Sequence, residues 1–252
     1  MSEPTWTIFD LAAQWRQAGF GAVVSLQRPD RGLHDVRLRG QPLDHAELLG
    51  LVLPNAVAQP DRVPVECHAR GRDVIAQYPE SADWPVWVEV VWRVVPEDPS
   101  RGIFAGVDVI ASVRTALLES WPELAVGSRM VAEEAFTLAD AATARFDSCG
   151  VLGADRVFES GGPGVFVARL ARTPFSYAEM VHPADGQGST VAGSRDQPAL
   201  LRTRHRLFAE RLEKGVLLRS RVRGVLLDRS NDLRVAAGCY AEFAAADPPL
   251  GT

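Results

Sequence analysis

The chain has 252 residues, of which 46% are hydrophobic and 23% are charged, and these proportions are typical of folded globular proteins. They exclude the low hydrophobicity of intrinsically disordered chains. The net charge of -5 lacks the basic excess that a general nucleic-acid-binding protein needs for its phosphate contacts. We therefore expect a soluble protein that does not bind nucleic acid, folded as a single domain over residues 1–252.

The cysteines and the N-terminal residues indicate the cellular compartment in which we expect the protein. Cys67, Cys149 and Cys239 are far apart and odd in number, so they predict neither a disulfide framework nor a CxxC metal site. The first residues lack the basic and apolar regions of a signal peptide, and no apolar stretch approaches the roughly 18 residues of a membrane-spanning helix. We expect a cytoplasmic protein with three free thiols and no contact with a membrane.

The N-terminal region predicts one helix followed by one strand. Phe9, Leu11 and Trp15 recur at helical spacing within residues 7–18, and Gly19 follows where a left-handed residue commonly ends a helix. Directly after it, a short apolar run at residues 21–26 predicts a strand.

The middle of the chain predicts a series of strands. These segments are rich in β-branched residues and are separated by Pro, Gly and Asp. They cover residues 62–67, 74–78, 86–95 and 103–118. The stretch from residue 107 to 118 also resembles a helix near its end, but the alternation of its β-branched residues favours a strand.

The last third of the chain predicts a meander of long antiparallel strands over residues 164–172, 177–182, 200–212, 215–228 and 233–243. The linker that ends in Gly215 predicts that residues 200–212 and 216–228 pair as a hairpin. The expected fold class is mainly β: an antiparallel β-sandwich or supersandwich with one N-terminal helix at about residues 7–18.

Motifs for cofactors and metals are absent from the sequence. It contains no GxGxxG after a strand, no GxxxxGK[ST], no HExxH and no GxSxG. We therefore predict no cofactor and no metal site. The histidines are dispersed, and a structural role is the alternative for each of them; they are His34, His45, His68, His182 and His205.

Alternating arginines occur in two of the predicted strands. Since neighbouring residues of a strand point to opposite sides, each series lines one face of its strand. The two series are Arg202, Arg204 and Arg206, and Arg219, Arg221 and Arg223.

If the predicted hairpin forms, these arginines make a ridge suited to a carboxylate, sulfate or phosphate. Arg204, His205 and Arg221 are then the candidate ligand-binding residues. The alternative is an exposed sheet face neutralised by salt bridges, with Glu210, Glu213 and Asp228 as partners.

His182 is a further candidate because it ends a predicted strand and precedes Pro183, which terminates the ladder. A histidine at a strand end beside a loop is well placed to face a ligand. A capping or turn role is an equal alternative for this residue.

The C-terminal meander, the His182-Pro183 strand end and the run from Phe208 to Val216 together resemble the galactose-mutarotase-like supersandwich proteins, over roughly residue 62 to the end. The resemblance implies a concave sugar site in which a histidine acid and a glutamate base open and close the pyranose ring. In this chain it implies that His182 protonates the ring oxygen. It also implies that Glu210 or Glu213 takes the anomeric proton.

The first functional expectation is therefore a carbohydrate-related protein that binds a sugar or acts as a mutarotase. Two alternatives stay open: an interaction or scaffold protein without chemistry, and a binder of a small anionic ligand through an arginine-rich sheet face. The expected partner is a small sugar or anion. The sequence leaves open whether the protein is an enzyme and which oligomeric state it adopts.

Overall fold

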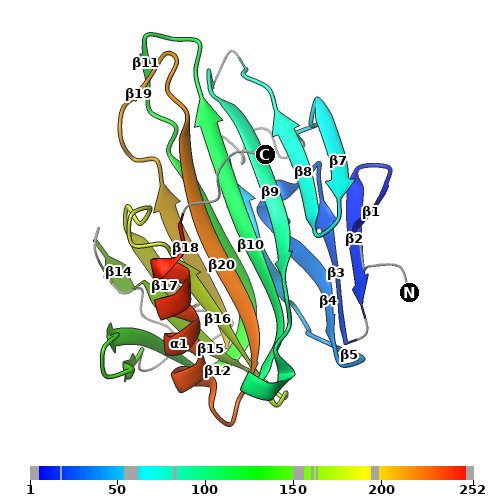
Figure 1. Ribbon diagram of the computed structural model, residues 1–252, viewed down its shortest axis with the longest axis vertical. Coiled ribbons are helices and arrows are strands. Elements are labelled where there is room, and N and C mark those ends of the chain that lie inside the picture. Colours follow the sequence, from blue (N-terminus) through cyan, green and yellow to red (C-terminus); the bar gives the residue numbers. More distant parts are fainter. Residues whose placement is uncertain are drawn as a thin grey trace.

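The computed structural model of the chain describes residues 6–17, 19–53, 62–81, 84–149, 156–159, 162, 164–193 and 199–247. These residues form mostly β-strands, with one α-helix near the C-terminal end (Figure 1). The strand pairings among them are antiparallel. The prediction of a mainly β, antiparallel fold is confirmed.

The first strands form an N-terminal sheet. Its members are β1 (Trp6–Phe9), β2 (Ala12–Gln17), β3 (Phe20–Ser25), β4 (Leu33–Leu38) and β5 (Gln41–Pro42). The short 3-10 helix η1 (Pro29–Arg31) connects β3 to β4. β6 (Glu47–Val52) pairs with β4 through Leu33 and Leu48 and continues into a second sheet.

The second sheet has the strand order β14, β17, β18, β12 and β6. Its further members are β14 (Arg156–Phe158), β17 (Ser189–Gly193), β18 (Leu200–Leu207) and the first half of β12 (Leu124–Asp140). The second half of β12 leaves this sheet and enters the largest one. β12 therefore ties the two sheets together.

The large sheet has the order β7, β8, β9, β10, β20, β16, β15, β12 and β13. Its strands are β7 (Glu66–Arg70), β8 (Asp73–Tyr78), β9 (Trp87–Val95), β10 (Ile103–Arg114), β13 (Arg145–Ser148), β15 (Val165–Leu170), β16 (Phe175–Val181) and β20 (Leu218–Asp228). The 3-10 helix η2 (Pro99–Arg101) connects β9 to β10. β11 (Glu119–Ser120) and β19 (Leu212–Glu213) form a separate two-stranded sheet.

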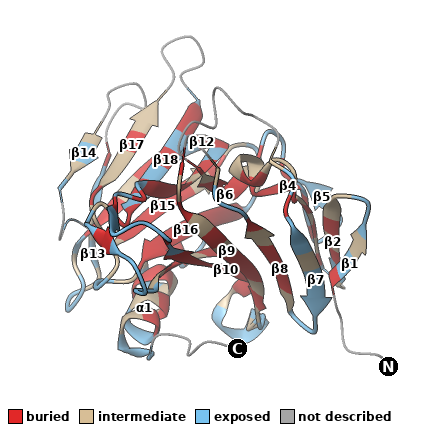
Figure 2. Ribbon diagram, turned by 90° about the horizontal axis from the view of Figure 1, so that it is seen from above, coloured by how far each residue is buried: buried red, intermediate tan, exposed pale blue. Residues whose placement is uncertain are grey.

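The main hydrophobic core is built from the inward faces of these sheets, where alternate residues of each strand meet (Figure 2). Trp15, Trp92 and Tyr78 are its largest fully buried side chains. Burial of each large apolar side chain contributes about 1.5–3 kcal/mol, so this core supplies most of the driving force for folding.

The α-helix α1 (Asp232–Ala245) covers the outer face of the large sheet over β15, β16 and β20 (Figure 1). Phe243 is fully buried there against a second apolar cluster that includes Met180 and Leu227. The prediction of a strand at residues 233–243 is therefore wrong. Ala236, Tyr240 and Phe243 lie at helical spacing, and the many alanines of this segment favour a helix.

The predicted helix at residues 7–18 is also wrong, because this segment forms the hairpin of β1 and β2. Ala13 and Trp15 alternate inward and are fully buried, and the Trp15 ring packs against Trp6 with centroids 5.6 Å apart. Phe9, which fits the helical pattern, is instead 47% exposed. Burial of the two tryptophans across the hairpin therefore favours strands over the helix that the spacing predicts. Ala18, the last residue of the predicted helix, lies outside the described residues.

Most other predicted strands are found, but one predicted pairing is wrong. β3, β8, β9 and β10 match the sequence prediction closely, whereas β7 begins at Glu66 rather than at residue 62. β18 pairs with β12 and β17, and β20 pairs with β10 and β16. The two strands with alternating arginines therefore belong to different sheets and do not form a hairpin.

Cys67, Cys149 and Cys239 are free thiols, as predicted. Burial raises the pKa of the Cys149 and Cys239 thiols, which keeps them in the unreactive protonated form. Within the described part of the chain, no helix has both the length and the apolar character needed to cross a membrane.

Candidate functional site

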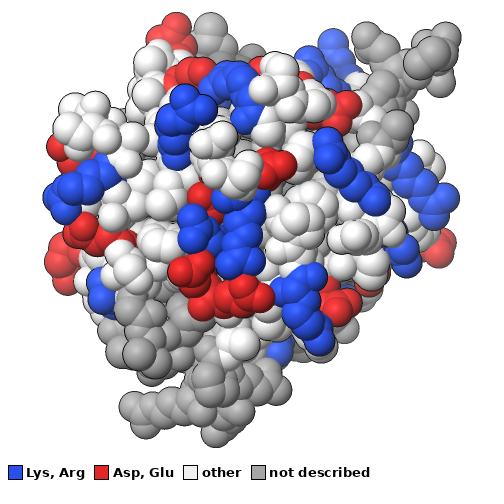
Figure 3. All heavy atoms as spheres, turned by 90° about the horizontal axis from the view of Figure 1, so that it is seen from below, with Lys and Arg blue, Asp and Glu red and all other residues white. Residues whose placement is uncertain are grey.

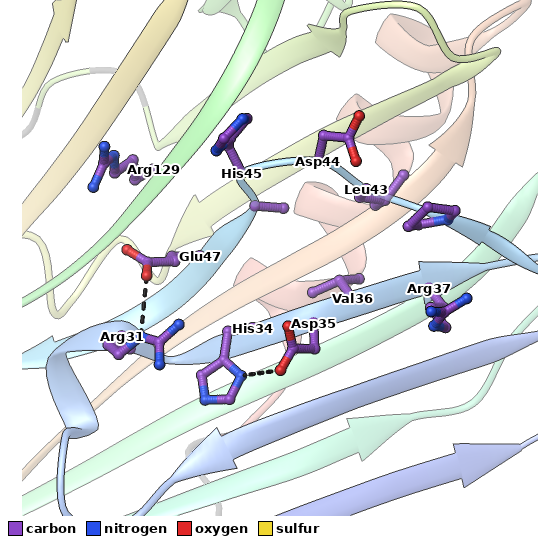
Figure 4. Close-up of a pocket in the computed structure, with 12 residues that line it drawn as sticks. Arg31, His34, Asp35, Val36, Arg37, Leu43, Asp44, His45, Glu47 and Arg129 are labelled. Atoms are coloured by element: carbon purple, nitrogen blue, oxygen red, sulfur yellow. Dashed lines mark hydrogen bonds and ion pairs between the residues drawn. The ribbon is translucent and has the colours of Figure 1, made fainter.

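A hollow lies where the N-terminal sheet meets the second sheet, and we call it the His34 pocket. Its volume is about 410 Å³. Figure 4 shows the side chains that line it. Its walls come from η1, β4, the segment between β5 and β6, β6 and β12. Its charged and histidine side chains are Arg31, His34, Asp35, Arg37, Asp44, His45, Glu47 and Arg129. Two larger hollows among the described residues, of about 490 and 570 Å³, contain no histidine.

The backbone that carries these side chains is irregular. The register between β3 and β4 shifts next to His34, which marks a β-bulge. Asp35 and His45 both adopt positive φ angles, 50° and 55°, which are uncommon for residues other than glycine. Such conformations cost of order 1–3 kcal/mol each and concentrate at functional sites. Seven other described non-glycine residues also have positive φ angles, so the His34 pocket is the leading candidate site because histidine and charged side chains converge on it.

His34 is the most perturbed titratable group in the pocket. Its ring Nδ1 lies 3.2 Å from Asp35 Oδ2, and the residue is only 7% exposed. Burial and the positive charge of Arg31 lower the pKa of His34, although Asp35 opposes this shift. The imidazole is therefore neutral at neutral pH, and a neutral imidazole can accept a proton.

The pocket contains equal numbers of arginines and carboxylates. Arg31 Nε lies 3.1 Å from Glu47 Oε1, and Asp44 is bonded to Arg172 just outside the pocket. Figure 4 shows Arg37 and Arg129 at opposite ends, with the histidines and carboxylates between them. The three arginines and three carboxylates offer many donors and acceptors without a large excess of either charge.

Pro42, Leu43, Ala46 and Val36 add an apolar side to the pocket. A ligand with both hydroxyl groups and apolar C–H surface is complementary to such a mixed lining. Among the described residues, no three His, Cys, Asp or Glu side chains converge in a way that could hold a metal ion. The chemistry that the pocket offers is hydrogen bonding and proton transfer by its own side chains.

The structure places His205 in a different, buried cluster around Glu179. Glu179 lies on β16, is fully buried, and points into the core between the large and second sheets. Its Oε1 accepts hydrogen bonds from Thr203 Oγ1 at 2.7 Å and from His205 Nε2 at 2.6 Å. Its Oε2 accepts from Tyr177 OH at 2.6 Å and also from Ser128 Oγ.

These hydrogen bonds determine the protonation state of Glu179. Burial alone would raise the pKa of Glu179, but the hydrogen bonds from His205 and Ser128 outweigh burial and lower it. The carboxylate is therefore ionised and accepts from His205 Nε2, and His205 Nδ1 lies 2.8 Å from Ser189 Oγ. Every member is satisfied, which is typical of a polar network that specifies the packing of a core.

His182 and Arg221 come together on the outer face of the large sheet. The backbone N–H of His182 donates to Arg221 O at 3.3 Å, and both side chains contact the Phe243 ring of α1. Arg221 Nη2 donates to the carbonyls of Phe243 and Ala246, so it binds the C-terminal end of the helix. Both His182 Nε2 and Arg221 Nε are covered and have no hydrogen-bond partner among the described residues.

The remaining candidates lie elsewhere. Glu210 is exposed in the segment after β18, and Glu213 lies on β19, where it is ion-paired with Arg211. Neither has a contact with His182 among the described residues. Arg204 is exposed on the outward face of β18, on the opposite side of the strand from His205.

Sequence reasoning named His34 and His45 only as dispersed histidines. A usable signal was present, because a His-Asp pair at residues 34–35 is mirrored by an Asp-His pair at residues 44–45. What brings the two pairs together is the turn at β5, which returns the chain alongside β4.

No protein-family model matches the sequence, and no curated protein matches it. Solved structures do. The Slr1438 protein from Synechocystis sp. PCC 6803 superposes with a TM-score of 0.61 at 7% sequence identity, covering 90% of this chain and 98% of that one. A putative aldose 1-epimerase from Escherichia coli K12 gives a TM-score of 0.59 at 9% identity, covering 88% of this chain and 99% of the other.

A galactose mutarotase-like protein from Lactobacillus casei ATCC 334 gives a TM-score of 0.57 at 10% identity, with 84% of this chain and 99% of the other covered. The chain has the aldose 1-epimerase fold. The predicted likeness in fold to the galactose-mutarotase-like proteins is thereby confirmed. The shared fold accounts for 84–90% of the chain in these three comparisons.

Proposed function

We propose that the protein binds an uncharged monosaccharide in the His34 pocket. The observation that carries the proposal is the convergence of two histidines, three arginines and three carboxylates on one hollow of about 410 Å³. This volume lies within the range of small-molecule sites, about 300–1,000 Å³. The likeness to aldose epimerases and mutarotases supports a sugar as the ligand.

The balance of charge favours a neutral sugar over an anion or a cation. A sugar hydroxyl donates one hydrogen bond and accepts others, so it can bridge an arginine and a carboxylate. Arg129 at one end of the pocket and Asp35 between the two ends are exposed, and they offer a donor and an acceptor to such hydroxyls. The apolar wall at Leu43 is suited to the C–H groups of a pyranose ring.

His34 is the residue that we assign to proton transfer. It is neutral at neutral pH because its pKa is lowered, so it can accept the proton of the anomeric hydroxyl when a pyranose ring opens. As the C1–O5 bond breaks, water donates a proton to the ring oxygen O5, which gives the open-chain aldehyde. When the ring closes on the other face of the carbonyl, the O5 hydroxyl releases its proton to water and the imidazolium returns its proton to the carbonyl oxygen, which completes the interconversion of anomers. Asp35, beside the ring, stabilises the imidazolium formed in between.

The proposal is tested by titrating the protein with glucose, galactose and mannose and following the heat of binding. We expect Arg129→Gln to weaken the binding of the preferred sugar roughly tenfold or more, because a hydrogen bond to a charged group is lost. Arg145→Gln, an exposed arginine on β13, is the matched control and should bind like the parent. Absence of binding by all three sugars, or equal losses in both variants, would contradict the proposal.

Anomer exchange, measured by NMR of the same sugar, separates an enzyme from a binding protein. We expect the parent to accelerate the exchange and His34→Gln to lose roughly a hundredfold of that acceleration, the usual share of general acid–base catalysis. His68→Gln on β7 is the control. If the parent binds the sugar without accelerating anomer exchange, the sugar site is supported and the proton-transfer role of His34 is contradicted.

A further inference from the structure

Four exposed arginines lie together on the outward face of the second sheet, and we call them the arginine ridge. They are Arg129 on β12 and Arg202, Arg204 and Arg206 on β18. Arg129 stands directly opposite Arg202 in the antiparallel register. Because alternate residues of a strand are about 6.8 Å apart, the three arginines of β18 span about 14 Å.

No residue in the described part of the chain neutralises the ridge. None of its four guanidinium groups makes an ion pair or hydrogen bond with a residue that the structure describes. The one carboxylate opposite the ridge on β6 is Glu47, which is engaged by Arg31. Elsewhere the pattern is different, as on the end of the molecule in Figure 3, where basic and acidic side chains lie next to one another.

Uncompensated arginines in this arrangement have an energetic cost. Like charges directly opposite each other on neighbouring strands are destabilising, and this applies to Arg129 and Arg202. The cost stands out in a chain whose net charge is -5. A bound anion removes the repulsion, and guanidinium groups are suited to pair with carboxylates and sulfates in bidentate geometry.

We propose that the arginine ridge binds the charged groups of an acidic polysaccharide. The choice of a sugar polymer rests on the proposed function, since Arg129 belongs both to the ridge and to the His34 pocket. The ridge and the pocket are therefore adjacent and share Arg129. One sugar unit in the pocket and the following acidic units along β18 form a continuous ligand.

The surface around the ridge favours such a chain over a nucleic acid. The residues that share its face are small, namely Ala125 and Gly127 on β12 and Thr190 and Ala192 on β17. Proteins that bind single-stranded nucleic acids usually add aromatic side chains on which the bases stack. The outward positions of β12 and β18 that pair in this register carry none.

The experiment measures the affinity for polygalacturonate, a polymer of uronic acids, at low and at high sodium chloride, with uncharged dextran as a comparison. The variant Arg202→Gln/Arg204→Gln/Arg206→Gln removes most of the ridge and leaves the His34 pocket complete. Its control is Arg101→Gln/Arg145→Gln/Arg211→Gln, which changes the net charge equally at exposed sites away from the ridge and the pocket.

We expect polygalacturonate to bind the parent, to be released by salt, and to bind the ridge variant roughly tenfold or more weakly, with little change in the control. Failure of polygalacturonate to bind at low salt, or equal losses in both variants, would overturn the proposal. Tighter binding of a single-stranded oligothymidylate would assign the ridge to a nucleic acid instead. Binding of uncharged monosaccharides is measured in parallel, so failure of the His34 pocket is distinguished from failure of the ridge.

Discussion

Two strands of this protein carry the same pattern of alternating arginines and use it in opposite ways. On β18, Arg202, Arg204 and Arg206 are exposed and have no ion-pair partner among the described residues. On β20, the arginines are half-buried or buried, and Arg223 is held by Asp108 through two hydrogen bonds of 2.6 and 2.8 Å.

The difference between the two strands lies in what faces them. The outer face of β20 is flanked by Asp108 on β10, which neutralises Arg223, and is partly covered by α1. The outer face of β18 is flanked by small residues and by Arg129. Alternation in a sequence therefore tells which residues share a face, while the neighbouring strands decide whether that face is neutralised or left free for a ligand.

The largest effect is expected on the inner face of β18, where His205 and Thr203 meet Glu179. Glu179→Gln replaces a carboxylate that accepts four hydrogen bonds with an amide that accepts at one atom only. We expect a loss of about 3–5 kcal/mol in the free energy of unfolding, measured by denaturant titration. The exposed Glu213→Gln should stay within about 0.5 kcal/mol of the parent.

The same variant predicts a pH dependence. The pKa of Glu179 in the folded protein is lowered, so its contribution to stability is present above the ordinary value of 4.5 and is lost as the pH falls through the lower, folded value. The difference in unfolding free energy between parent and Glu179→Gln should therefore be largest near neutral pH and shrink below about 4.5. A difference that stays constant down to the acid transition would show that Glu179 is protonated in the native state.

An intermediate effect is expected on β20. Arg223→Gln leaves the Asp108 carboxylate, whose side chain is 5% exposed, without its bidentate partner. Removal of one partner from a buried pair costs about 3 kcal/mol, to be measured as a lower denaturant midpoint. Arg204→Gln on β18 is the matched change and should cost less than about 0.5 kcal/mol. Equal losses of stability in the two variants would contradict the conclusion that the arginines of β20 are neutralised and those of β18 are not.

The smallest effect is expected from the ridge as a whole. Replacing Arg202, Arg204 and Arg206 together by glutamine removes the repulsion between these side chains and Arg129. The free energy of unfolding at low salt, measured by denaturant titration, should therefore rise by no more than about 0.5–1 kcal/mol. The increase should vanish at high salt because exposed charges are screened. A clear loss of stability would mean that the ridge is neutralised by contacts with other parts of the chain.

The two ends of the chain show how tertiary contacts reverse local patterns. Residues 7–18 have helical spacing but form a hairpin, because pairing brings Trp6 onto Trp15 and buries both. The segment at residues 233–243 was expected to extend the meander, but it forms α1 because the outer face of the large sheet is apolar and Phe243 is buried on it. Each pattern was compatible with two structures, and long-range burial selected one.

The candidate site also combines features that the sequence shows with features that depend on the tertiary structure. The His34 pocket needs β4, the turn that returns the chain to β6, and Arg129 from a strand far along the sequence. The His-Asp and Asp-His pairs are visible in the sequence, but the bulge at β4 and the positive φ angles that orient them are not. Arg204 was named from the sequence as a ligand-binding candidate, while its neighbour Arg129 was found only through the strand register.

The sequence by itself determined the fold class, the free cysteines, most strand positions and which arginines share a face. These properties follow from composition and from the period-two pattern, which are local. Only the tertiary structure decided which strands are neighbours, which end of the chain is helical, and where histidines and carboxylates meet. Those outcomes depend on contacts between residues far apart in the sequence, because burial and charge compensation are properties of a neighbourhood and not of a residue.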